Sequence, residues 1–444
     1  MKGVLVEEQR STVPETAKQV REIPPRWDWV EPLVWTDKML AALERGVKGG
    51  KWFSLIDKVY FLANLESAWK QVAANRGSAG IDNVSIKHYR RHAEQRLKRS
   101  SELLKQDKYQ PAGVKRVWID KPGSKEKRPL GIPTVTDRVV QTALRNVIEP
   151  IFEQDFCEYS YGFRPHRSCK DALRRVDRLL KQGSNYVVDA DIKGYFDSIP
   201  QDKLMQLIED KIADSRVLAL LRLYLSQEVI DTAASWTPEA GTPQGAVISP
   251  ILANIYLNPL DWMMQDKGYA MTRYADDFIV MCETREEAEN ALELIKTWTE
   301  GVGLTLHPTK TKIINADEEI FEFLGYKFKQ GMKFPTDKSI KKFRDNIRKH
   351  TRRSNGKSLE QIILKLKPIQ RGWFEYFKHC HRNSFPDQDR WTRRRLRSIL
   401  KKYEKRKGIA TIHNDNIRYP NRIFDSYGFF SLVRAHRELC QSLK

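Results

Sequence analysis

The stretch Tyr274-Ala-Asp276-Asp277 lies between two apolar segments and decides how this chain folds. The residues from Met271 to Cys282 are predicted to form a β-hairpin whose tip carries both aspartates. Adjacent carboxylates repel each other in a confined site. A pair of Mg²⁺ ions would relieve that repulsion and clamp the attacking and leaving oxygens of a phosphoryl transfer. The alternative is a tight surface turn, in which aspartate is common.

A second apolar segment supplies further carboxylates. The residues from Asn185 to Asp191 predict a buried strand, which is followed by Ile-Lys-Gly-Tyr-Phe196-Asp197. A metal site needs ligands from more than one strand, and Asp191 can supply the third. Asp189 and Asp197 are competing candidates, and alternation along a strand puts Asp189 and Asp191 on the same face. The residues by themselves therefore leave this choice open.

Outward from these segments, helical and strand-like patterns alternate. Helices are predicted at 35–43, 53–76, 137–152, 168–182, about 200–213 and 284–301, and strands at 114–119, 128–133, 304–314 and 319–328. Ser249 is predicted to cap a further helix, with Pro250 at its first position and Pro259 kinking or restarting it. Thr284 and Glu287 form a capping-box pattern. After about residue 335 the chain is predicted to be helical and very basic.

Composition indicates a polyanionic partner. Lys and Arg total 78 against 57 Asp and Glu, so the net charge is +21, which suits nucleic acid. The length of 444 residues predicts two or three domains. The five cysteines show no paired spacing, which argues against a disulfide framework or zinc knuckle and fits a reducing cytoplasm. No apolar run approaches the roughly 20 residues of a membrane span, so no membrane partner is expected.

The order of the motifs resembles the palm series of reverse transcriptases, and more closely that of bacterial group II intron-encoded reverse transcriptases, or maturases. The palm motifs are Asp191-Ile-x-x-x-Phe196, Thr242-Pro-Gln-Gly245 and Tyr274-Ala-Asp-Asp277. The wider signature comprises Asn75-Arg-Gly-Ser-Ala-Gly-Ile-Asp82, Arg128-Pro-Leu-Gly-Ile-Pro133, Tyr161-Gly-Phe-Arg-Pro165, Ser249-Pro250, Lys310-Thr311, Phe323-Leu-Gly-Tyr326, Gly372-Trp-Phe-Glu-Tyr-Phe377 and Trp391-x-x-Arg-Arg-Leu. The resemblance covers about residue 60 to the C-terminus.

This resemblance implies an α+β right-hand polymerase. The expected parts are an N-terminal extension at 1–50, fingers at 51–185, a palm with an antiparallel sheet at 186–334, and an α-helical thumb or maturase (X) domain at 335–444. The expected reaction is RNA-templated attack of a primer 3′-hydroxyl on a dNTP. The expected location is the bacterial cytoplasm.

The resemblance also assigns roles to single residues. Asp191, Asp276 and Asp277 are implied to be the catalytic metal ligands, helped by the Ile192 carbonyl, for two Mg²⁺ ions that Mn²⁺ could replace. Phe196 would exclude a 2′-hydroxyl, although a core aromatic is the alternative. The other implied nucleotide-binding residues are Lys121, Arg128, Gln244, Gly245 and Lys310; for Lys121 a solvated turn lysine is the alternative, and for Lys310 a surface charge. The primer grip would be Phe323, Leu324, Gly325 and Tyr326, and RNA binding would use Arg393, Arg394, Arg395 and Arg397.

The implied partners are group II intron RNA, an RNA template with a DNA primer, a DNA target and dNTPs. Family members assist splicing of their intron and copy it into DNA for retromobility. Two alternatives stay open: a purely RNA-binding splicing factor, and a domesticated enzyme of defence or CRISPR adaptation. Because no cysteine–histidine pattern follows the thumb region, an HNH endonuclease is not expected, and priming would use an existing 3′-end.

Overall fold

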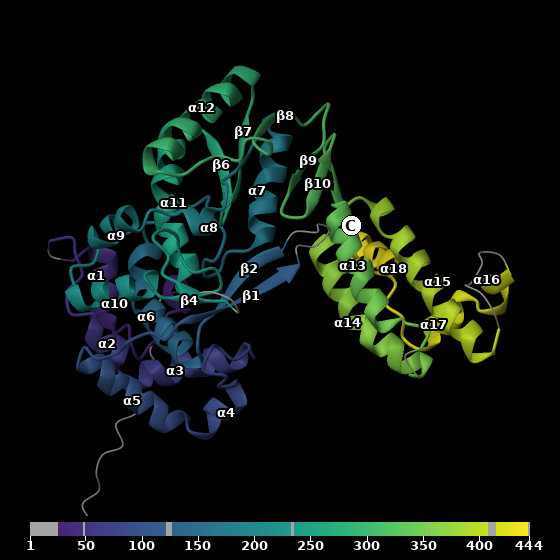
Figure 1. The fold of residues 1–444 in the computed structure, drawn as a ribbon. Coiled ribbons are helices and arrows are strands. Elements are labelled where there is room, and N and C mark those ends of the chain that lie inside the picture. The colour runs from purple at the N-terminus through teal and green to yellow at the C-terminus, as the bar shows by residue number, and fades with distance from the viewer. Residues whose placement is uncertain are drawn as a thin grey trace, which may run out of the picture.

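The computed structural model describes residues 25–47, 49–120, 127–231, 235–354, 356–406 and 414–442. Figure 1 shows an N-terminal helical region around the β1–β2 hairpin, a central sheet beside it, and a separate C-terminal helical domain. The β9–β11 sheet lies between the central sheet and that domain. This mixture of helices and mainly antiparallel sheets confirms the α+β class. No helix in the described ranges has the length and apolar character that a membrane span requires.

The N-terminal region is built mainly from helices. Its elements are η1 (Pro25–Trp27), α1 (Asp37–Arg45), α2 (Ile56–Tyr60), α3 (Leu62–Ala74), α4 (Ile86–Arg91), α5 (Ala93–Lys105), β1 (Val114–Asp120), β2 (Lys127–Ile132) and α6 (Val135–Glu153). The predicted short helix near 35–43 is confirmed as α1. Trp27 and Trp35 are 1% and 0% exposed and belong to the core of this region, so the described part of the N-terminal extension packs onto the helices that follow it.

The central region contains the predicted hairpin and its neighbours. Its elements are α7 (Cys169–Lys181), β3 (Tyr186–Asp191), α8 (Tyr195–Ser198), α9 (Gln201–Glu209), α10 (Ser215–Leu225), β4 (Val229–Ile230), β5 (Ser235–Trp236), α11 (Ser249–Asp266), β6 (Ala270–Tyr274), β7 (Asp277–Cys282), α12 (Arg285–Val302) and β8 (Lys312–Asn315). The sheet has the strand order β6-β7-β3-β8 and is antiparallel throughout. A second sheet has the order β2-β1-β4-β5.

The two faces of the central sheet belong to different cores. Val188 and Val280 join the core shared with the N-terminal region, whereas Val187 and Ile279 join the core shared with α7 and the C-terminal domain. Successive residues of a strand point to opposite faces, so one sheet can serve both cores. The sheet is thereby clamped from both sides, which holds its strand register firmly.

Five sequence expectations need correction. The predicted helix at 53–76 is two helices that break at Phe61, and the predicted strand at 319–328 is two strands, Phe321–Phe323 and Tyr326–Lys329. Ser249 does not cap α11: the helix begins at Ser249 with Ile248 as its N-cap, and the Ser249 hydroxyl donates to the Pro243 carbonyl instead. Pro259 lies inside α11 without ending it, because packing of a helix that is buried along most of its length outweighs the loss of one backbone hydrogen bond. The predicted strand at 304–314 is ordered as a strand only in β8. The capping box of Thr284 and Glu287 is confirmed at the start of α12.

The C-terminal part begins with a small antiparallel sheet and continues as helices. Its elements are β9 (Phe321–Phe323), β10 (Tyr326–Lys329), β11 (Met332–Pro335), α13 (Asp337–His350), α14 (Leu359–Phe377), η2 (Arg382–Ser384), α15 (Pro386–Tyr403), α16 (Asn414–Arg418), α17 (Asn421–Ser426) and α18 (Leu432–Ser442). Aromatic side chains fill its core: Trp373 lies 4.8 Å from Phe343 and 4.9 Å from Phe377 between ring centroids.

Candidate functional site

Strand register brings the predicted metal ligands together. β3 ends at Asp191 and β7 begins at Asp277, and the two residues are direct cross-strand partners. Tyr274 pairs with Asp277 across the hairpin, so Ala275 and Asp276 form a two-residue turn. Like charges placed directly opposite each other destabilise a sheet. The arrangement therefore favours a cation between these carboxylates.

The electrostatics of the carboxylates agree with that geometry. Loss of water contact, together with repulsion from Asp189, Asp276 and Asp191, raises the pKa of Asp277 to about 7, although this residue still reaches solvent. Burial raises the pKa of Asp276 as well. The Lys310 ammonium lies 2.6 Å from Asp191 Oδ2 and so places one positive charge at the site. The carboxylates repel one another, and a cation bound among them would lower these pKa values.

The two competing aspartates occupy different positions around this pair. Asp189 lies two residues before Asp191 in β3, where it pairs with Ile279 of β7 and with Lys312 of β8. Burial raises the pKa of Asp189 to about 6. Asp197 lies in α8 and accepts a hydrogen bond from Gln244 Nε2 at 3.0 Å. Of the three candidates, Asp191 is therefore the one that directly faces the paired aspartates.

The backbone around Ile192 bonds to residues 305–307, on the side of β3 away from the hairpin. Ile192 pairs with Leu306, while the flanking bonds run from Lys193 N–H to the Thr305 carbonyl and from His307 N–H to the Asp191 carbonyl. In such a non-hydrogen-bonded pair, the N–H and C=O groups of Ile192 point to the opposite edge of the strand. Because β7 lies along that edge, the carbonyl is directed toward the aspartates.

These residues suit a divalent cation with oxygen ligands. Within the ranges that the structure describes, no three acidic, histidine or cysteine side chains converge into a finished metal site. Mg²⁺, however, takes only one or two protein carboxylates and completes its shell with water and substrate phosphates. Paired aspartates that repel one another, next to an outward carbonyl, match that requirement. A structural zinc site would instead need four protein ligands that leave no coordination position open.

Several predicted nucleotide-binding residues meet beside the aspartates. Arg128 Nε lies 3.4 Å from Gln244 Oε1, and the Gln244 side chain also reaches Asp197. The Gln244 carbonyl accepts from Gly131 N–H at 2.6 Å, which docks this loop onto β2. Gly245 has a φ of +101°, and a Cβ there would lie 2.3 Å from the Gly131 carbonyl oxygen. Glycine is required at this point because the two backbones touch.

Phe196 of α8 is half-buried, and its ring centroid lies 5.6 Å from that of Tyr195. It is therefore neither a fully buried core aromatic nor a free surface side chain. A cavity of about 460 Å³ opens next to it and is lined by Asp197, Gln244, Arg116 and Trp236 among others. Lys121 lies outside the described residues.

The four residues expected as primer grip form the turn between β9 and β10. Leu324 and Gly325 both have positive φ, +47° and +79°, as a two-residue type I′ turn requires. The Leu324 N–H donates to the Asp277 carboxylate, and the Leu324 carbonyl accepts from the Tyr376 hydroxyl at 2.7 Å. Phe323 and Tyr326 are buried on either side. This turn thus connects the catalytic hairpin to helix α14.

The four predicted RNA-binding arginines of α15 have different surroundings. Arg397 is 5% exposed and donates to the Tyr419 carbonyl, and Arg395 donates to Thr351 at the end of α13. Arg393 packs over the Phe429 ring at 4.7 Å. Arg394 is exposed and lines an open groove of about 820 Å³, in the C-terminal domain and away from the aspartates. Arg393 and Arg397 also border this groove, and its remaining arginines are Arg344, Arg390, Arg434 and Arg437.

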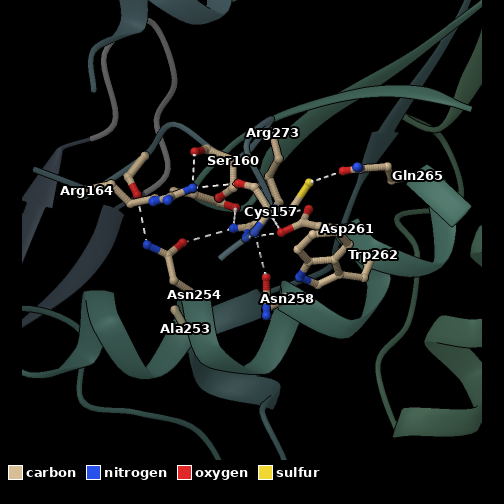
Figure 2. Close-up of polar contacts among 12 residues, drawn as sticks. Cys157, Ser160, Arg164, Ala253, Asn254, Asn258, Asp261, Trp262, Gln265 and Arg273 are labelled. Carbon is tan, nitrogen blue, oxygen red and sulfur yellow. Dashed lines mark hydrogen bonds and ion pairs between the residues drawn. The ribbon is translucent and has the colours of Figure 1, made fainter. Parts of the chain in front are cut away.

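Sequence reasoning missed one set of residues that touches the site. Arg273, just before the catalytic motif, is fully buried and bonded to Asp261 of α11 (Figure 2). A signal existed in the sequence, because Asn254, Asn258 and Asp261 recur at helical spacing in an otherwise apolar segment.

Two protein-family models match parts of this chain. Residues 119–328 match the family described as reverse transcriptase (RNA-dependent DNA polymerase). Residues 340–416 match the group II intron, maturase-specific domain. The first match contains the aspartate site and the turn between β9 and β10, and the second contains most of α13 and all of α14 and α15.

Individual relatives agree with the family matches. The group II intron-encoded protein LtrA of Lactococcus lactis subsp. cremoris is 42% identical over 196 residues, which are 44% of this chain and 32% of LtrA. The chain thus matches about a third of the length of LtrA. Protein YkfC of Escherichia coli (strain K12) is 33% identical over 287 residues, which are 56% of this chain and 75% of YkfC. A solved structure of Candida albicans telomerase aligns with 70% of this chain and 63% of its own at 13% identity, with a TM-score of 0.41. On the sequence matches, the chain belongs to the family of group II intron-encoded reverse transcriptases.

Proposed function

We propose that this chain is an RNA-directed DNA polymerase that requires a divalent metal ion. The observation that carries the proposal is the cross-strand pairing of Asp191 with Asp277 next to Asp276. A protein that only bound RNA would have no use for carboxylates held in mutual repulsion. The carboxylates destabilise the folded protein, and this cost is explained if they bind metal ions that arrive with the substrate.

In this proposal Asp191, Asp276 and Asp277 hold two Mg²⁺ ions, with the Ile192 carbonyl as a further ligand and Mn²⁺ as a possible substitute. Bound ions of this kind stabilise the attacking and leaving oxygens of an in-line phosphoryl transfer. The Leu324 backbone N–H would help to hold the Asp277 carboxylate, whose pKa it lowers as a hydrogen-bond donor. These groups together would align a primer 3′-hydroxyl with the α-phosphate of a dNTP.

The nucleotide would be held by the neighbouring residues. Arg128 and Lys310 are cationic and can make charge-assisted contacts to a triphosphate, and Lys121 is proposed for the same role. Gln244 and Gly245 would border the pocket, and the half-buried ring of Phe196 would stand where a ribose 2′-hydroxyl has to fit. Lys310 would exchange its present bond with Asp191 for the phosphates.

We assign 51–185 to the fingers, 186–334 to the palm and 335–444 to the thumb and maturase region. Residues 25–47 pack with the fingers in this assignment. The exposed arginines of the C-terminal domain support binding of intron RNA, which would assist splicing and supply the template for retromobility. The other proposed partners are a DNA primer, a DNA target and dNTPs, in the bacterial cytoplasm.

The test is primer extension on an RNA template by wild-type protein and by Asp276→Asn. We expect the variant to lose extension while its RNA affinity stays within about twofold, because the carboxylate serves the transition state more than binding. Asp266→Asn, an exposed residue at the end of α11, is the matched control. Residual extension by Asp276→Asn within tenfold of wild type would refute the assignment. Wild-type protein that binds intron RNA but never extends a primer would identify a pure splicing factor.

A further inference from the structure

Helix α11 carries a polar stripe that faces the catalytic hairpin. Asn254, Asn258, Asp261 and Gln265 recur at intervals of four, three and four residues, which places them on one side of a helix. Asn254 and Asp261 are 1% and 3% exposed. Buried polar side chains need partners, and Figure 2 shows where those of the stripe lie.

One side of the stripe holds the loop that follows α6. Asn258 Oδ1 accepts from Cys157 N–H at 3.0 Å, and Asn254 Nδ2 donates to the Gly162 carbonyl at 2.8 Å. The loop in turn lies against the hairpin, because Tyr161 N–H donates to the Arg273 carbonyl at 2.8 Å. A Cβ on Gly162 would lie 2.2 Å from Ala275 N. The loop and the catalytic turn are therefore in direct backbone contact.

The other side of the stripe holds Arg273, whose guanidinium is fully buried. Its Nε donates to Asp261 Oδ1 at 2.7 Å (Figure 2). Its Nη1 donates to Asn254 Oδ1 and to the Ala275 carbonyl, both at 2.9 Å. The planar guanidinium can bind these three partners at once because its N–H groups form a rigid fork.

The carbonyl that Arg273 binds belongs to a strained turn. Ala275 has a φ of +61°, a left-handed conformation that residues other than glycine rarely adopt. Such a conformation persists only where the surroundings enforce it. Gly162 is in close backbone contact with the turn, and Arg273 donates a hydrogen bond to the Ala275 carbonyl. The next residues along the chain are Asp276 and Asp277.

We propose that Arg273 is a positioning residue of the polymerase site. Its guanidinium is fixed by Asp261 and Asn254, binds the Ala275 carbonyl, and thereby sets where the carboxylates of Asp276 and Asp277 stand. Asp261 supplies the compensating charge, so that the cation can be buried. The inference rests on the proposed polymerase function, to which it adds a residue that touches neither substrate nor metal.

A purely structural ion pair would have different consequences. Arg273→Lys keeps a positive charge beside Asp261, but an ammonium cannot hold Asp261 and Ala275 in the same fork. The double variant Arg273→Met with Asp261→Leu removes both charges, an exchange that is often neutral for stability. Arg216→Gln is the matched control, because Arg216 of α10 likewise binds a carboxylate, Asp107, and backbone carbonyls, but where α10 meets the end of α5.

The experiment measures kcat and KM for dNTP in primer extension, thermal melting, and hydrogen exchange of the 270–280 peptide. For Arg273→Lys and the double variant we expect an unchanged KM and a lower melting temperature, because Asn254 Oδ1 and the Ala275 carbonyl lose their buried donor. We expect kcat to fall roughly 10- to 100-fold, as a catalytic group displaced by about 1 Å would cause, and exchange in the 270–280 peptide to become faster. Arg216→Gln should change neither kcat nor that exchange.

A double variant that melts like wild type and extends within twofold of it, with unchanged exchange, would overturn the proposal and leave the pair a stabilising contact only. If wild-type protein shows no extension at all, the proposed function fails. The exchange measurement then still decides whether Arg273 holds the turn.

Discussion

The β6–β7 hairpin and helix α15 each carry a run of like charges, and the fold arranges the two runs in opposite ways. At the hairpin, the register of β3 against β7 sets Asp191 directly opposite Asp277, next to Asp276 in the turn. In α15, Arg393, Arg394 and Arg397 border one groove, with Arg397 buried and Arg394 exposed, whereas Arg395 bonds to Thr351 at the end of α13. Successive residues of a helix point about 100° apart, so a consecutive run cannot form one face.

This difference shows which kind of sequence pattern predicts a site. A motif that ends a strand has its position fixed by cross-strand pairing, so its residues converge wherever the sheet forms. A run of arginines in a helix reports only net charge. The basic surface of the C-terminal domain is instead assembled from several helices, as the groove lined by Arg344, Arg394 and Arg434 illustrates.

The largest effect is expected at the carboxylates. Asp191→Asn should lower primer extension by at least about a thousandfold, since stabilisation of transition-state charge by bound metal ions amounts to several kcal/mol. RNA affinity, measured by filter binding of the same preparation, should stay within about twofold. If RNA binding were lost together with extension, the hairpin would serve RNA binding as well as catalysis, which contradicts the comparison with α15.

A smaller but still large effect is expected where the loop meets the hairpin. Gly162→Ala would bring a methyl group 2.2 Å from Ala275 N, so the catalytic turn has to shift. A displacement of this kind should reduce kcat by about a hundredfold. Gly372→Ala in α14 meets nothing within 4 Å and is the control; it should leave extension unchanged and stabilise slightly, by up to about 1 kcal/mol. Equal rates for both variants would contradict the close packing.

The buried arginine of α15 should affect stability rather than RNA binding. Arg397→Gln leaves the Tyr419 carbonyl and Asn421 Oδ1 without their donors. The expected loss is about 1–3 kcal/mol in the free energy of unfolding, measured by urea denaturation. RNA affinity under conditions in which the variant is folded should not change. A variant as stable as wild type but weaker in RNA binding would place Arg397 on the RNA surface.

The primer-grip turn tests how the two regions communicate. Tyr376→Phe removes the hydrogen bond from the Tyr376 hydroxyl to the Leu324 carbonyl. The N–H of the same residue, Leu324, interacts with the Asp277 carboxylate. A hydrogen bond worth about 1 kcal/mol corresponds to a roughly fivefold lower kcat. The phenylalanine ring keeps the packing against Tyr326 and Phe377. An unchanged kcat would mean that α14 supports the turn by packing alone.

The smallest effect is expected at the exposed arginine. Arg394→Gln should reduce the slope of log RNA affinity against log salt by just under one unit, because one phosphate contact releases about one counterion. Thermal stability should be unaffected. The same slope in wild type and variant would show that Arg394 does not contact phosphate.

Much of the fold follows from local sequence patterns. The hairpin at Met271–Cys282, the strand ending at Asp191 and the capped helix after Thr284 form where alternation and capping signals place them. The failures concern tertiary context. Pro259 stays inside α11 because the surrounding core holds that helix together.

The site was predictable where motifs lie on strands and turns. The residues alone could not separate Asp189 from Asp191, because both have the same parity; only the pairing of Asp191 with Asp277 distinguishes them. Arg273 escaped notice because its role depends on α11, a helix whose orientation toward the hairpin is a tertiary property. The one signal for Arg273 in the sequence was the row of polar residues at helical spacing in the apolar segment that forms α11.

The most direct test of the central claim is a count of the Mn²⁺ ions bound by the protein in complex with an RNA template, a 3′-deoxy-terminated DNA primer and a dNTP. Electron paramagnetic resonance of free Mn²⁺ gives that number. Wild-type protein should bind two ions, as a two-metal site requires, and Asp189→Asn should also bind two. Asp191→Asn should bind fewer than two. Two ions in Asp191→Asn, or a loss in Asp189→Asn alone, would contradict the account.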